Sequence, residues 1–569
     1  MRYLALATDY DGTLAHHGRV DATTLASIER LAASGRKLIL VTGRELPDLK
    51  RVFPELDRFD RVVAENGALL YTPATRKERV LADAPPAAFV SELELRGVKP
   101  LSVGASIVAT WHPMENVVLQ VIRDLGLELQ VIFNKGAVMV LPAGVNKSTG
   151  LAAALEELGL SPHNVVAVGD AENDHALLQS VQASVAVANA VPALKAAADI
   201  VTRADHGAGV AELIDSLLES DLTDLQPQDA RRTLLLGVRA DSTEVRIPAL
   251  GHTLLVAGTS GSGKSTLTTS LLEQLRARRY QCCVIDPEGD YDELADVIGF
   301  GTAERAPDVA EILTGLERPG ESVVVNLLGV KLQDRPAFFA SLLLRLQEQR
   351  ARTGRPHWIL VDEAHHLLPT NWEPAPQTLT QALTSMVYVT VHPDALAPAV
   401  REGIDVVAVL GDAPRDVFKA VGIAVPSGLP ALESGQAMLS LYRGEPVIVA
   451  VPPSHSERRR HQRKYAKGEL GPDRSFYFRG PQNKLNLRAQ NLITFLQLAE
   501  GVDEETWFHH LGSGHYSQWL ANCIKDEDLA RDVQAVERQA AQLDAATSRA
   551  RIRAAIEQRY TLPEDASPL

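Results

Sequence analysis

Cysteine is scarce in this chain: it has three among 569 residues, and two of them are adjacent, at Cys282 and Cys283. So few cysteines supply neither a disulfide framework nor a zinc site with the usual ligand spacing. Aromatic residues are also few, at 5% of the chain. No uncharged apolar run reaches the roughly 18 residues that a membrane-spanning helix needs. The scarcity of cysteine favours a reducing compartment, and the lack of a long apolar run argues against a membrane span. We therefore expect a cytoplasmic protein with no membrane partner.

Positive charge is in deficit as well. The chain has 57 Lys and Arg against 72 Asp and Glu, a net charge of −15. Long-range attraction to nucleic acid or anionic lipid needs a positive potential, so the composition argues against a protein that coats either. A local basic groove stays compatible with it. The length corresponds to three or four domains of roughly 100 to 200 residues each.

Apolar segments of strand length alternate with helical patterns through most of the chain, which is typical of α/β domains with parallel sheets. We expect a Rossmann-like domain with an α/β cap, then a second domain with a parallel sheet, then a small and mainly helical domain. The expected boundaries are 1–218 for the first domain (cap about 82–141), 219–230 for a linker, 231–455 for the second domain, 456–470 for a basic linker and 471–569 for the last.

Two carboxylates, Asp9 and Asp11, stand at the end of the first predicted strand and are followed by Gly12. Open α/β sheets bind ligands at the carboxyl ends of their strands, and glycine allows a sharp turn there. Such a pair can divide the work of phosphoryl transfer. Asp9 can attack phosphorus as the nucleophile, while Asp11 protonates the leaving oxygen and then activates water.

Two carboxylates that face a phosphate dianion require positive charge, which a metal ion and a lysine can supply. The sequence offers ligands for such a metal and also a lysine. Asp170 and Asp174 follow another predicted strand and offer hard oxygen ligands suited to Mg²⁺. Lys147 lies in a polar segment just ahead of a predicted helix. Thr42 directly follows the predicted strand 37–41, and its hydroxyl can bind phosphate oxygens there. We therefore expect Mg²⁺ as a cofactor of a phosphate-ester site.

These four motifs, in this order, resemble the haloacid dehalogenase superfamily of aspartate-nucleophile phosphatases. The resemblance implies a phosphoaspartate at Asp9. It also implies Mg²⁺ held by Asp9, the carbonyl of Asp11 and Asp170, with Asp174 in support.

The segment 62–71 is similar to the one that precedes the α/β cap in the Cof and sucrose-phosphatase-like members of that superfamily. Such a cap implies a small phosphorylated metabolite as the substrate, and both phosphoglycolate and sugar phosphates fit. Candidate contacts in the cap are Trp111, His112, Asn134 and Lys135, although each also fits an ordinary surface or core position.

A second phosphate site follows the predicted strand 253–256, where a glycine-rich loop precedes a helical pattern. This is the phosphate-binding loop in its required strand, loop and helix context. Its backbone N–H groups can wrap phosphates, Lys264 can reach the β and γ oxygens, and Ser265 can ligate Mg²⁺. We expect ATP to bind through Gly258, Ser260, Gly261, Ser262, Gly263, Lys264, Ser265 and Thr266.

The apolar strand 358–361 ends in Asp362 and Glu363. Asp362 is expected to steady the Mg²⁺ shell, and Glu363 to polarise the water that attacks the γ-phosphate. Because a kinase must keep water away from the γ-phosphate, this glutamate favours an ATP hydrolase.

The order of these features resembles the FtsK/HerA-type P-loop ATPases over about residues 231–455. The segment 387–394 is similar to the strand that carries their polar sensor residue, for which Thr390 and His392 are candidates. The resemblance implies a homo-oligomeric ring, with DNA as a partner of the ATPase. The chain departs from that class in lacking an obvious long insertion that grips DNA.

The C-terminal third leaves two interpretations open. The basic run 456–467 fits a solvated connector or a contact with an anion or nucleic acid. Between residues 476 and 519, aromatic and basic residues are interleaved, as in proteins that hold single-stranded nucleic acid, but aromatics at helical spacing more often form a core.

Together these motifs predict a bifunctional hydrolase, a capped phosphatase joined to an ATP-hydrolysing domain. Two alternatives stay open. One is a nucleic-acid end-processing enzyme that combines a phosphatase with a kinase. The other is an ATP-assembled oligomer, DNA-acting or of the defence type, whose phosphatase works only after assembly.

Overall fold

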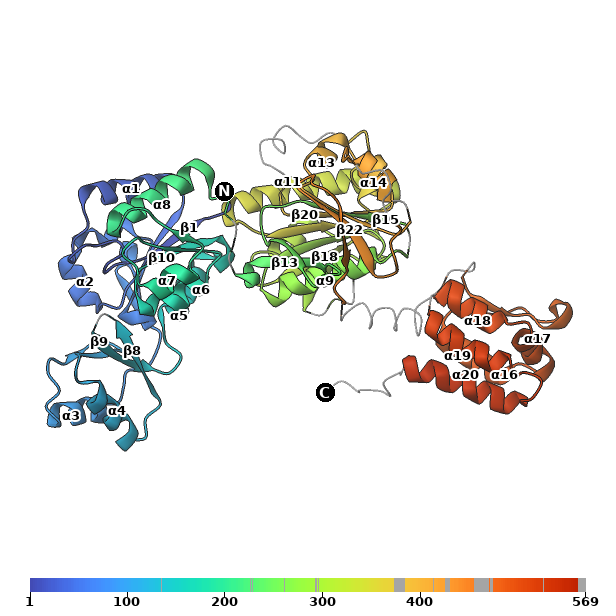
Figure 1. The fold of residues 1–569 in the computed structure, drawn as a ribbon, viewed down its shortest axis with the longest axis horizontal. Helices are drawn as coiled ribbons and strands as arrows, with labels where there is room; N and C mark the ends of the chain where they lie inside the picture. Colours follow the sequence, from blue (N-terminus) through green and yellow to red (C-terminus); the bar gives the residue numbers. More distant parts are fainter. Residues whose placement is uncertain are drawn as a thin grey trace. The chain divides into compact units, whose positions relative to one another are not determined.

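The computed structural model describes residues 1–134, 136–225, 227, 229–259, 261–291, 294, 296–372, 384–412, 414–424, 430–454, 470, 474–524 and 526–560. Lys135, Ser260 and the basic run 456–467, all singled out from the sequence, lie outside these residues. The chain forms two compact units, Met1–Pro452 and Pro453–Leu569 (Figure 1). Among the described residues, no helix combines the length and the apolar character that crossing a bilayer requires.

An eight-stranded sheet organises the first module of the larger unit. In spatial order its strands are β12 (Ile200–Val201), β11 (Ala183–Ala186), β10 (Val165–Gly169), β1 (Ala5–Asp9), β2 (Lys37–Val41), β3 (Arg61–Ala64), β4 (Leu69–Thr72) and β5 (Lys77–Val80). Strands β12 to β3 run parallel, and β4 and β5 are antiparallel to their neighbours.

Helices cover both faces of this sheet (Figure 1). One face carries α1 (Ala22–Ala33) and α8 (His206–Ser220), and the other carries α5 (Lys147–Leu158), α6 (His175–Gln179) and α7 (Pro192–Ala197); α2 (Leu46–Val52) follows β2. Because both faces are covered, the central strands β1 and β10 are buried along their whole length; β10 has no polar side chain, and those of β1 are confined to Thr8 and Asp9 at its end. The polar residues of the module are thereby concentrated where these strands end.

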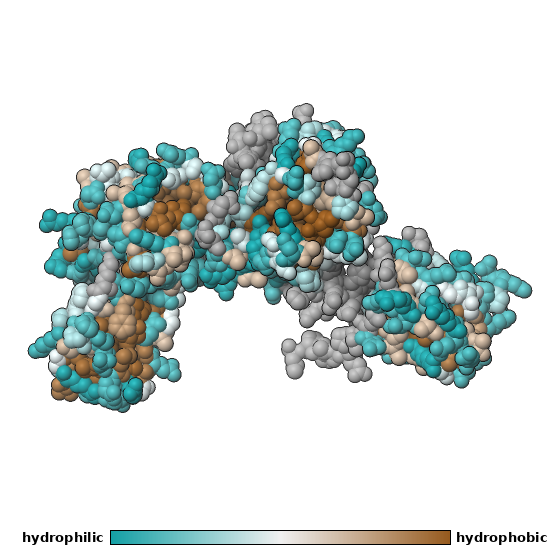
Figure 2. Space-filling model, in the orientation of Figure 1, coloured by the Kyte–Doolittle hydropathy of each residue, from teal (hydrophilic) through white to brown (hydrophobic). Residues whose placement is uncertain are grey.

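A smaller α/β insertion, the cap of this first module, lies between β5 and α5. Its antiparallel sheet has the order β6 (Ser102–Val103), β7 (Val108–Trp111), β9 (Ala137–Pro142) and β8 (Leu129–Asn134), with helices α3 (Ala87–Leu95) and α4 (Glu115–Asp124). The helices pack on one face of the sheet through Phe89, Leu93, Val118 and Val121. The other face lies over the ends of β1 and β2, as a cap would. Apolar residues show on the visible surface of this module (Figure 2), and Leu95 and Phe133 are among its exposed side chains.

The second module contains an eleven-stranded sheet. In spatial order its strands are β14 (Glu244–Pro248), β13 (Thr233–Val238), β23 (Val447–Ala450), β22 (Gln436–Leu441), β21 (Val406–Leu410), β15 (Leu254–Gly258), β20 (Met386–Thr390), β19 (Trp358–Val361), β16 (Cys282–Asp286), β18 (Ser322–Asn326) and β17 (Val297–Phe300). Strands β21 to β17 run parallel, and β22, β23, β13 and β14 extend the sheet in antiparallel fashion.

Two apolar cores lie on the two faces of this sheet. Helix α9 (Lys264–Ala277) packs in one, and α10 (Val309–Gly315), α11 (Arg335–Thr353), α13 (Pro398–Glu402) and α14 (Pro414–Ala420) pack in the other. Both modules are thus layered α/β folds built on parallel strands, and the fold class predicted from the alternating pattern is confirmed.

Buried polar contacts join the two modules within the larger unit. The ring of His163 stacks on Tyr280 with a centroid separation of 3.7 Å and an interplanar angle of 18°. The Tyr280 hydroxyl donates to Gln182 Oε1 at 2.6 Å. Arg232, at the start of the second module, forms an ion pair with Asp199 of the first.

The smaller unit is mainly helical and opens with a hairpin. Its elements are β24 (Phe476–Phe478), β25 (Leu487–Ala489), α16 (Leu492–Gly501), α17 (Glu504–Gly512), α18 (His515–Trp519), a π-helical turn (Leu520–Ile524), α19 (Glu527–Glu537) and α20 (Ala545–Arg559). The large aromatic rings share one core, in which Phe478, Trp507 and Tyr516 are fully buried. The visible surface of the unit is mostly hydrophilic (Figure 2). These rings therefore form a core, as their spacing indicates, and are not free to stack on bases.

Candidate active sites

The ends of three neighbouring strands bring the first set of predicted residues together. Asp9 ends β1, Thr42 follows β2, and Asp170 follows β10. Because β1 pairs in parallel with both β2 and β10, these three residues meet at one edge of the sheet. All three are nearly or fully buried.

Lys147 reaches this edge from the first turn of α5. Asn146 caps the helix by accepting from the backbone N–H groups of Ser148 and Thr149. A Cβ at Gly67 would lie 1.9 Å from the Asn146 carbonyl oxygen, and Gly67 has φ 109°, so only glycine lets the turn before β4 pack here. With the helix start fixed in this way, Lys147 Nζ lies 2.5 Å from Asp9 Oδ1 and 2.6 Å from Asp174 Oδ1.

The buried charges at this edge do not balance. Carboxylate oxygens of Asp9, Asp170 and Asp174 lie within 4.8 Å of one another, and Lys147 bonds to two of the three carboxylates. Burial is the main cause that raises the pKa of Asp9 to about 8. Lys147 opposes the rise, and Asp174 and Asp170 add to it. Three carboxylates and one ammonium leave an excess of negative charge among hard oxygen donors, which is the donor set that fits Mg²⁺.

Asp174 has a different place in this cluster from Asp9 and Asp170. Its Oδ2 accepts from the backbone N–H groups of Asp170 and Ala171, both at 3.0 Å, and its Oδ1 accepts from Lys147. Both oxygens are thus engaged in fixing the turn after β10 and the lysine. This arrangement suits a residue that supports a metal ligand better than one that binds the metal directly.

Asp11 is held by an arginine that the sequence did not connect to it. Arg44 donates from Nε to Asp11 Oδ2 at 2.6 Å and from Nη2 to Asp11 Oδ1 at 2.7 Å. Its third contact, from Nη1 to Asp48 Oδ2, is 2.5 Å long. Hydrogen bonds to these carboxylates raise the pKa of Arg44, so the guanidinium stays charged. The only signal in the sequence is an arginine two positions after Thr42.

A pocket of about 460 Å³ lies between this edge and the cap. Its lining includes Asp9, Asp11 and Arg44 from below and Trp111, Asn134 and Met139 from the cap. Two of the four candidate cap contacts, Trp111 and Asn134, thus line the same pocket as the predicted nucleophile. His112 does not line the pocket, and its Nδ1 lies 2.9 Å from Glu115 Oε1 on the surface.

The glycine-rich loop of the second module leads from β15 into α9. A Cβ at Gly258 would lie 2.0 Å from the Leu410 carbonyl oxygen, so the loop can start only with glycine here. Lys264 is nearly buried, and its Nζ donates to the carbonyl oxygens of Gly258 and Thr259 at 3.0 and 2.9 Å. Its ammonium thus lies folded over the loop whose N–H groups are expected to hold phosphate. Beside the loop is a hollow of about 290 Å³ lined partly by Val391, Leu410 and Val417.

Asp362 and Glu363 stand at the end of β19, two strands from the loop. Burial, together with the nearby carboxylates of Glu363 and Asp286, raises the pKa of Asp362 to about 7. Glu363 has left-handed backbone angles, φ 41° and ψ 48°, a conformation that costs free energy outside glycine and is concentrated at functional sites. Burial also raises the pKa of its carboxyl.

Thr390, one of the two sensor candidates, is fully buried at the end of β20, between β15 and β19. Its Oγ1 lies 3.0 Å from His365 Nδ1 and accepts from the backbone N–H of His392 at 3.0 Å. The side chain of His392, the other candidate, touches His365 edge-on with a centroid separation of 5.2 Å. His365 was not predicted from the sequence.

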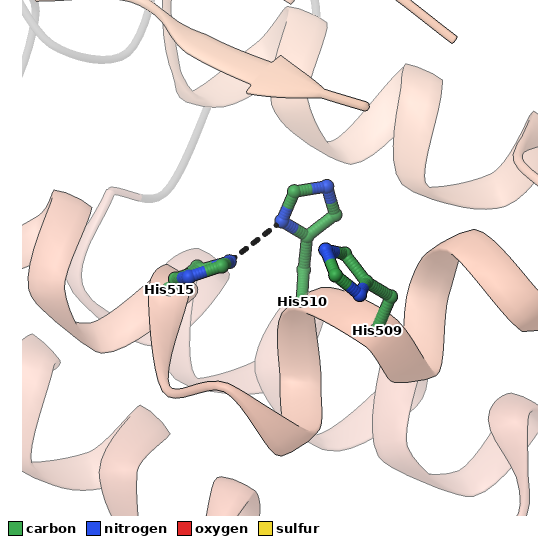
Figure 3. Close-up of side chains that lie close together, drawn as sticks. All are labelled: His509, His510 and His515. Atoms are coloured by element: carbon green, nitrogen blue, oxygen red, sulfur yellow. Dashed lines mark hydrogen bonds between the residues drawn. The ribbon is translucent and has the colours of Figure 1, made fainter. Parts of the chain in front are cut away.

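Three histidines of the smaller unit lie close together: His509 and His510 on α17, and His515 at the start of α18 (Figure 3). One ring nitrogen of each lies within 4.8 Å of the others. His510 Nε2 accepts from the backbone N–H groups of Arg479 and Gly480 at 3.0 and 3.3 Å, while its Nδ1 lies 3.0 Å from His515 Nδ1.

These contacts assign the tautomer of His510. A nitrogen that accepts from two N–H groups carries no proton, so the proton of the neutral ring is on Nδ1 and is donated to His515. Metal-binding histidines show the opposite pattern, in which the nitrogen away from the metal donates. The group is therefore a hydrogen-bonded structural cluster. Burial and the neighbouring histidines lower the pKa of His510 to about 4, which keeps this arrangement neutral.

Comparison with known proteins agrees with the two modules. The family described as haloacid dehalogenase-like hydrolase matches residues 6–93 and 116–214, and an AAA domain matches residues 251–393. A phosphoglycolate phosphatase from Methanothermobacter thermautotrophicus is 32% identical over 219 residues, which are 37% of this chain and 96% of the relative. One from Natronomonas pharaonis is 33% identical over 222 residues, again 37% of this chain and 96% of the relative.

Solved structures match a similar share of the chain. A haloacid dehalogenase-like hydrolase from Bacteroides thetaiotaomicron shows 18% identity and a TM-score of 0.34, covering 38% of this chain and 99% of that one. A HAD/COF-like hydrolase from Plasmodium vivax shows 20% identity and a TM-score of 0.35, covering 38% and 96%. On the evidence of the sequence relatives, the chain belongs to the haloacid dehalogenase-like hydrolases, as a phosphatase joined in one chain to an AAA P-loop ATPase domain.

Proposed function

We propose that the first module is a Mg²⁺-dependent phosphomonoesterase that acts through a phosphoaspartate at Asp9. The observation that carries this proposal is the position of Asp9, which is buried against Lys147 and opens into the cap pocket. The residues present fit a metal ion. Asp9, Asp170 and the carbonyl of Asp11 would hold Mg²⁺, with Asp174 in support. When bound, the ion offsets the negative charge shared by these carboxylates and the phosphate.

In the first step Asp9 attacks phosphorus and the ester P–O bond breaks. Asp11, in its protonated form with its carbonyl oxygen still accepting from Arg44, gives its proton to the leaving oxygen. In the second step Asp11 takes a proton from water, and the resulting hydroxide releases phosphate from Asp9. Lys147 lowers the pKa of Asp9 relative to that of the same buried carboxyl without it, and so favours the ionised form that attacks phosphorus.

The substrate in this proposal is a small phosphate ester. A pocket of about 460 Å³ beneath the cap leaves room for a group the size of a short acid or a single sugar. Relatives named phosphoglycolate phosphatase favour the short acid. The carboxylates of Glu45 and Asp48 in the lining favour an uncharged, hydroxyl-bearing group instead. A panel with phosphoglycolate and sugar phosphates separates the two.

The test of the phosphatase is Asp9→Asn, which removes the nucleophile at nearly constant volume. We expect release of phosphate from an aryl phosphate with Mg²⁺ to fall to the background rate, and chelation of the metal to do the same to the native protein. Asp57→Asn, at an exposed carboxylate, is the matched control and should keep full activity. Full activity of Asp9→Asn would refute the mechanism.

We further propose that the second module hydrolyses ATP in the manner of FtsK/HerA-type ATPases and assembles as a ring. The order of strands supports hydrolysis: β20 lies between β15 and β19, so that Thr390 stands between the loop and Glu363. Lys264→Ala and Glu363→Gln should each abolish ATP hydrolysis and leave the phosphatase intact.

Three measurements separate this proposal from its alternatives. Transfer of label from ATP to a 5′-hydroxyl oligonucleotide would indicate a kinase, and release of phosphate to water the hydrolase. Sedimentation with and without ATP tests the ring. Stimulation of ATP hydrolysis by DNA tests DNA as a partner.

A further inference from the structure

The glutamate expected to activate water lies beside an imidazole that also touches the end of β20. His365 is in a short 3₁₀ turn, Ala364–His366, directly after Glu363. Its Nδ1 lies 3.0 Å from Thr390 Oγ1 and 3.4 Å from Glu363 Oε2. A single ring nitrogen thus faces both the hydroxyl and the carboxylate.

Glu363 Oε2 is buried and has no hydrogen-bond partner among the described residues. An unpartnered buried carboxylate oxygen is costly, so it would gain free energy from any donor that came into line with it. The side chains of His365 and Glu363 are 11% and 18% exposed, which strengthens a polar contact between them relative to one in water.

We propose that His365 is a positioning residue for ATP hydrolysis, which links the hydroxyl of Thr390 to the carboxylate of Glu363. The inference rests on the proposed ATPase function of the second module. In this arrangement, Thr390 changes its hydrogen bond when nucleotide binds, and His365 then changes its hydrogen bond to Glu363.

The proposed link between Thr390 and Glu363 depends on where the single hydrogen of the Thr390 hydroxyl points. Thr390 Oγ1 already accepts from the His392 N–H, and its hydroxyl has one hydrogen to give. When that hydrogen points to His365 Nδ1, the nitrogen is an acceptor and can offer nothing to Glu363. When the hydrogen turns to a phosphate oxygen of bound nucleotide, Nδ1 can carry the imidazole proton and donate to Glu363 Oε2. The other oxygen of the glutamate is then left for water.

The surroundings keep the imidazole neutral, as both arrangements require. Burial and the neighbouring rings of His366 and His392 lower the pKa of His365 to about 4. The ring of His366 lies 4.0 Å from that of His365, centroid to centroid. A neutral ring can exchange its proton between the two nitrogens, whereas a charged one would hold the glutamate permanently.

The experiment measures steady-state ATP hydrolysis of the full chain with His365→Ala, His365→Asn and the matched control His366→Ala. His366 is exposed and adjacent. Loss of one hydrogen bond to a charged group predicts a fall in kcat of about 10- to 100-fold for His365→Ala, with KM nearly unchanged. His365→Asn, which keeps a polar atom near the position of Nδ1, should recover most of kcat, and His366→Ala should match the native chain.

A double-mutant cycle with Thr390→Val tests the link itself. If His365 acts through Thr390, the double variant should be no slower than the slower single variant. Native kcat in His365→Ala, or a loss that asparagine does not restore and that adds to the loss in Thr390→Val, would overturn the inference. If the native chain hydrolyses ATP no faster than Lys264→Ala, the proposed ATPase function itself fails, so the two failures are distinguishable.

Discussion

Replacing Lys147 by methionine gives the sharpest test of the charge arrangement in the phosphatase site. The substitution keeps the length of the side chain and removes its charge. Lys147 is 1% exposed and bonds to both Asp9 and Asp174, which are themselves buried. Breaking a buried ion pair from one side costs about 3–5 kcal/mol, because the remaining charge has neither water nor a partner.

An exposed pair supplies the matched control. Lys37 Nζ lies 2.8 Å from Asp60 Oδ1, and the lysine side chain is 47% exposed. Exposed pairs of this kind are worth about 0–1 kcal/mol, so Lys37→Met should change stability by no more than that. The two substitutions make the same chemical change and differ in burial, and the expected gap between them is about 3 kcal/mol.

The loss of stability caused by Lys147→Met should also depend on pH. In the native site the pKa of Asp9 is raised from 3.8 to about 8, and loss of Lys147 raises it further. A carboxyl with a raised pKa keeps its proton in the folded state while the unfolded state has lost it, so stability falls as pH rises from about 4 through the folded pKa. In the metal-free variant Asp9 is therefore protonated at pH 6, and the destabilisation should be smaller there than at pH 9.

Hydrogen exchange measured on peptides from β1 and β10, without Mg²⁺ at pH 6 and pH 9, reports the local free energy of opening in this module. Phosphatase activity should be lost at both pH values. A loss below about 1 kcal/mol for Lys147→Met at pH 9, equal to that of Lys37→Met, would show that the lysine does not hold this cluster together. Equal losses at the two pH values would contradict the raised pKa of Asp9.

Three further substitutions test other contacts. Arg44→Gln should lower phosphatase kcat by about tenfold or more with a small effect on KM, because Asp11 loses its orientation; unchanged kcat in steady-state assays would exclude this role. In native protein the stability due to neutral His510 is present above pH 6.5 and lost as pH falls toward its pKa of about 4. The free energy of unfolding, measured in urea at pH 4.5 and 7.5, should differ between these pH values by about 2 kcal/mol less in His510→Gln than in the native protein. The same difference in both proteins would refute this role of His510. Arg232→Met removes the cation that faces the buried Asp199 carboxylate, and thermal unfolding should show a loss of about 3 kcal/mol that Arg231→Met, at an exposed neighbour, does not share.

Much of the fold could be predicted from the sequence because its signals are local. The apolar strands 37–41 and 358–361 and the glycine-rich loop at 258–265 each occupy a few consecutive residues. Strand length, turn residues and loop chemistry are encoded within such segments. The cap was predicted on weaker grounds, from the resemblance of the segment 62–71 to the one that precedes such a cap.

The aromatic residues of the C-terminal unit show where local signals become ambiguous. Interleaved aromatic and basic residues allow both a core and a stacking surface, and burial of Phe478 and Trp507 decided for the core. The three histidines 509, 510 and 515 were not singled out at all. Their meaning depends on the N–H groups of Arg479 and Gly480, which belong to a different segment.

The sequence by itself determined which residues can do chemistry and at which strand ends they stand. Asp9, Asp170, Lys264 and Glu363 were all identified from patterns of a few residues. Only the tertiary structure decided which of them are partners: that Lys147 bonds to Asp9 across 138 positions, that Arg44 holds Asp11, and that His365 reaches Thr390. Pairing between distant segments depends on strand register and helix packing, and a difference of an ångström or two makes or breaks a hydrogen bond. Neither quantity is contained in any short stretch of sequence.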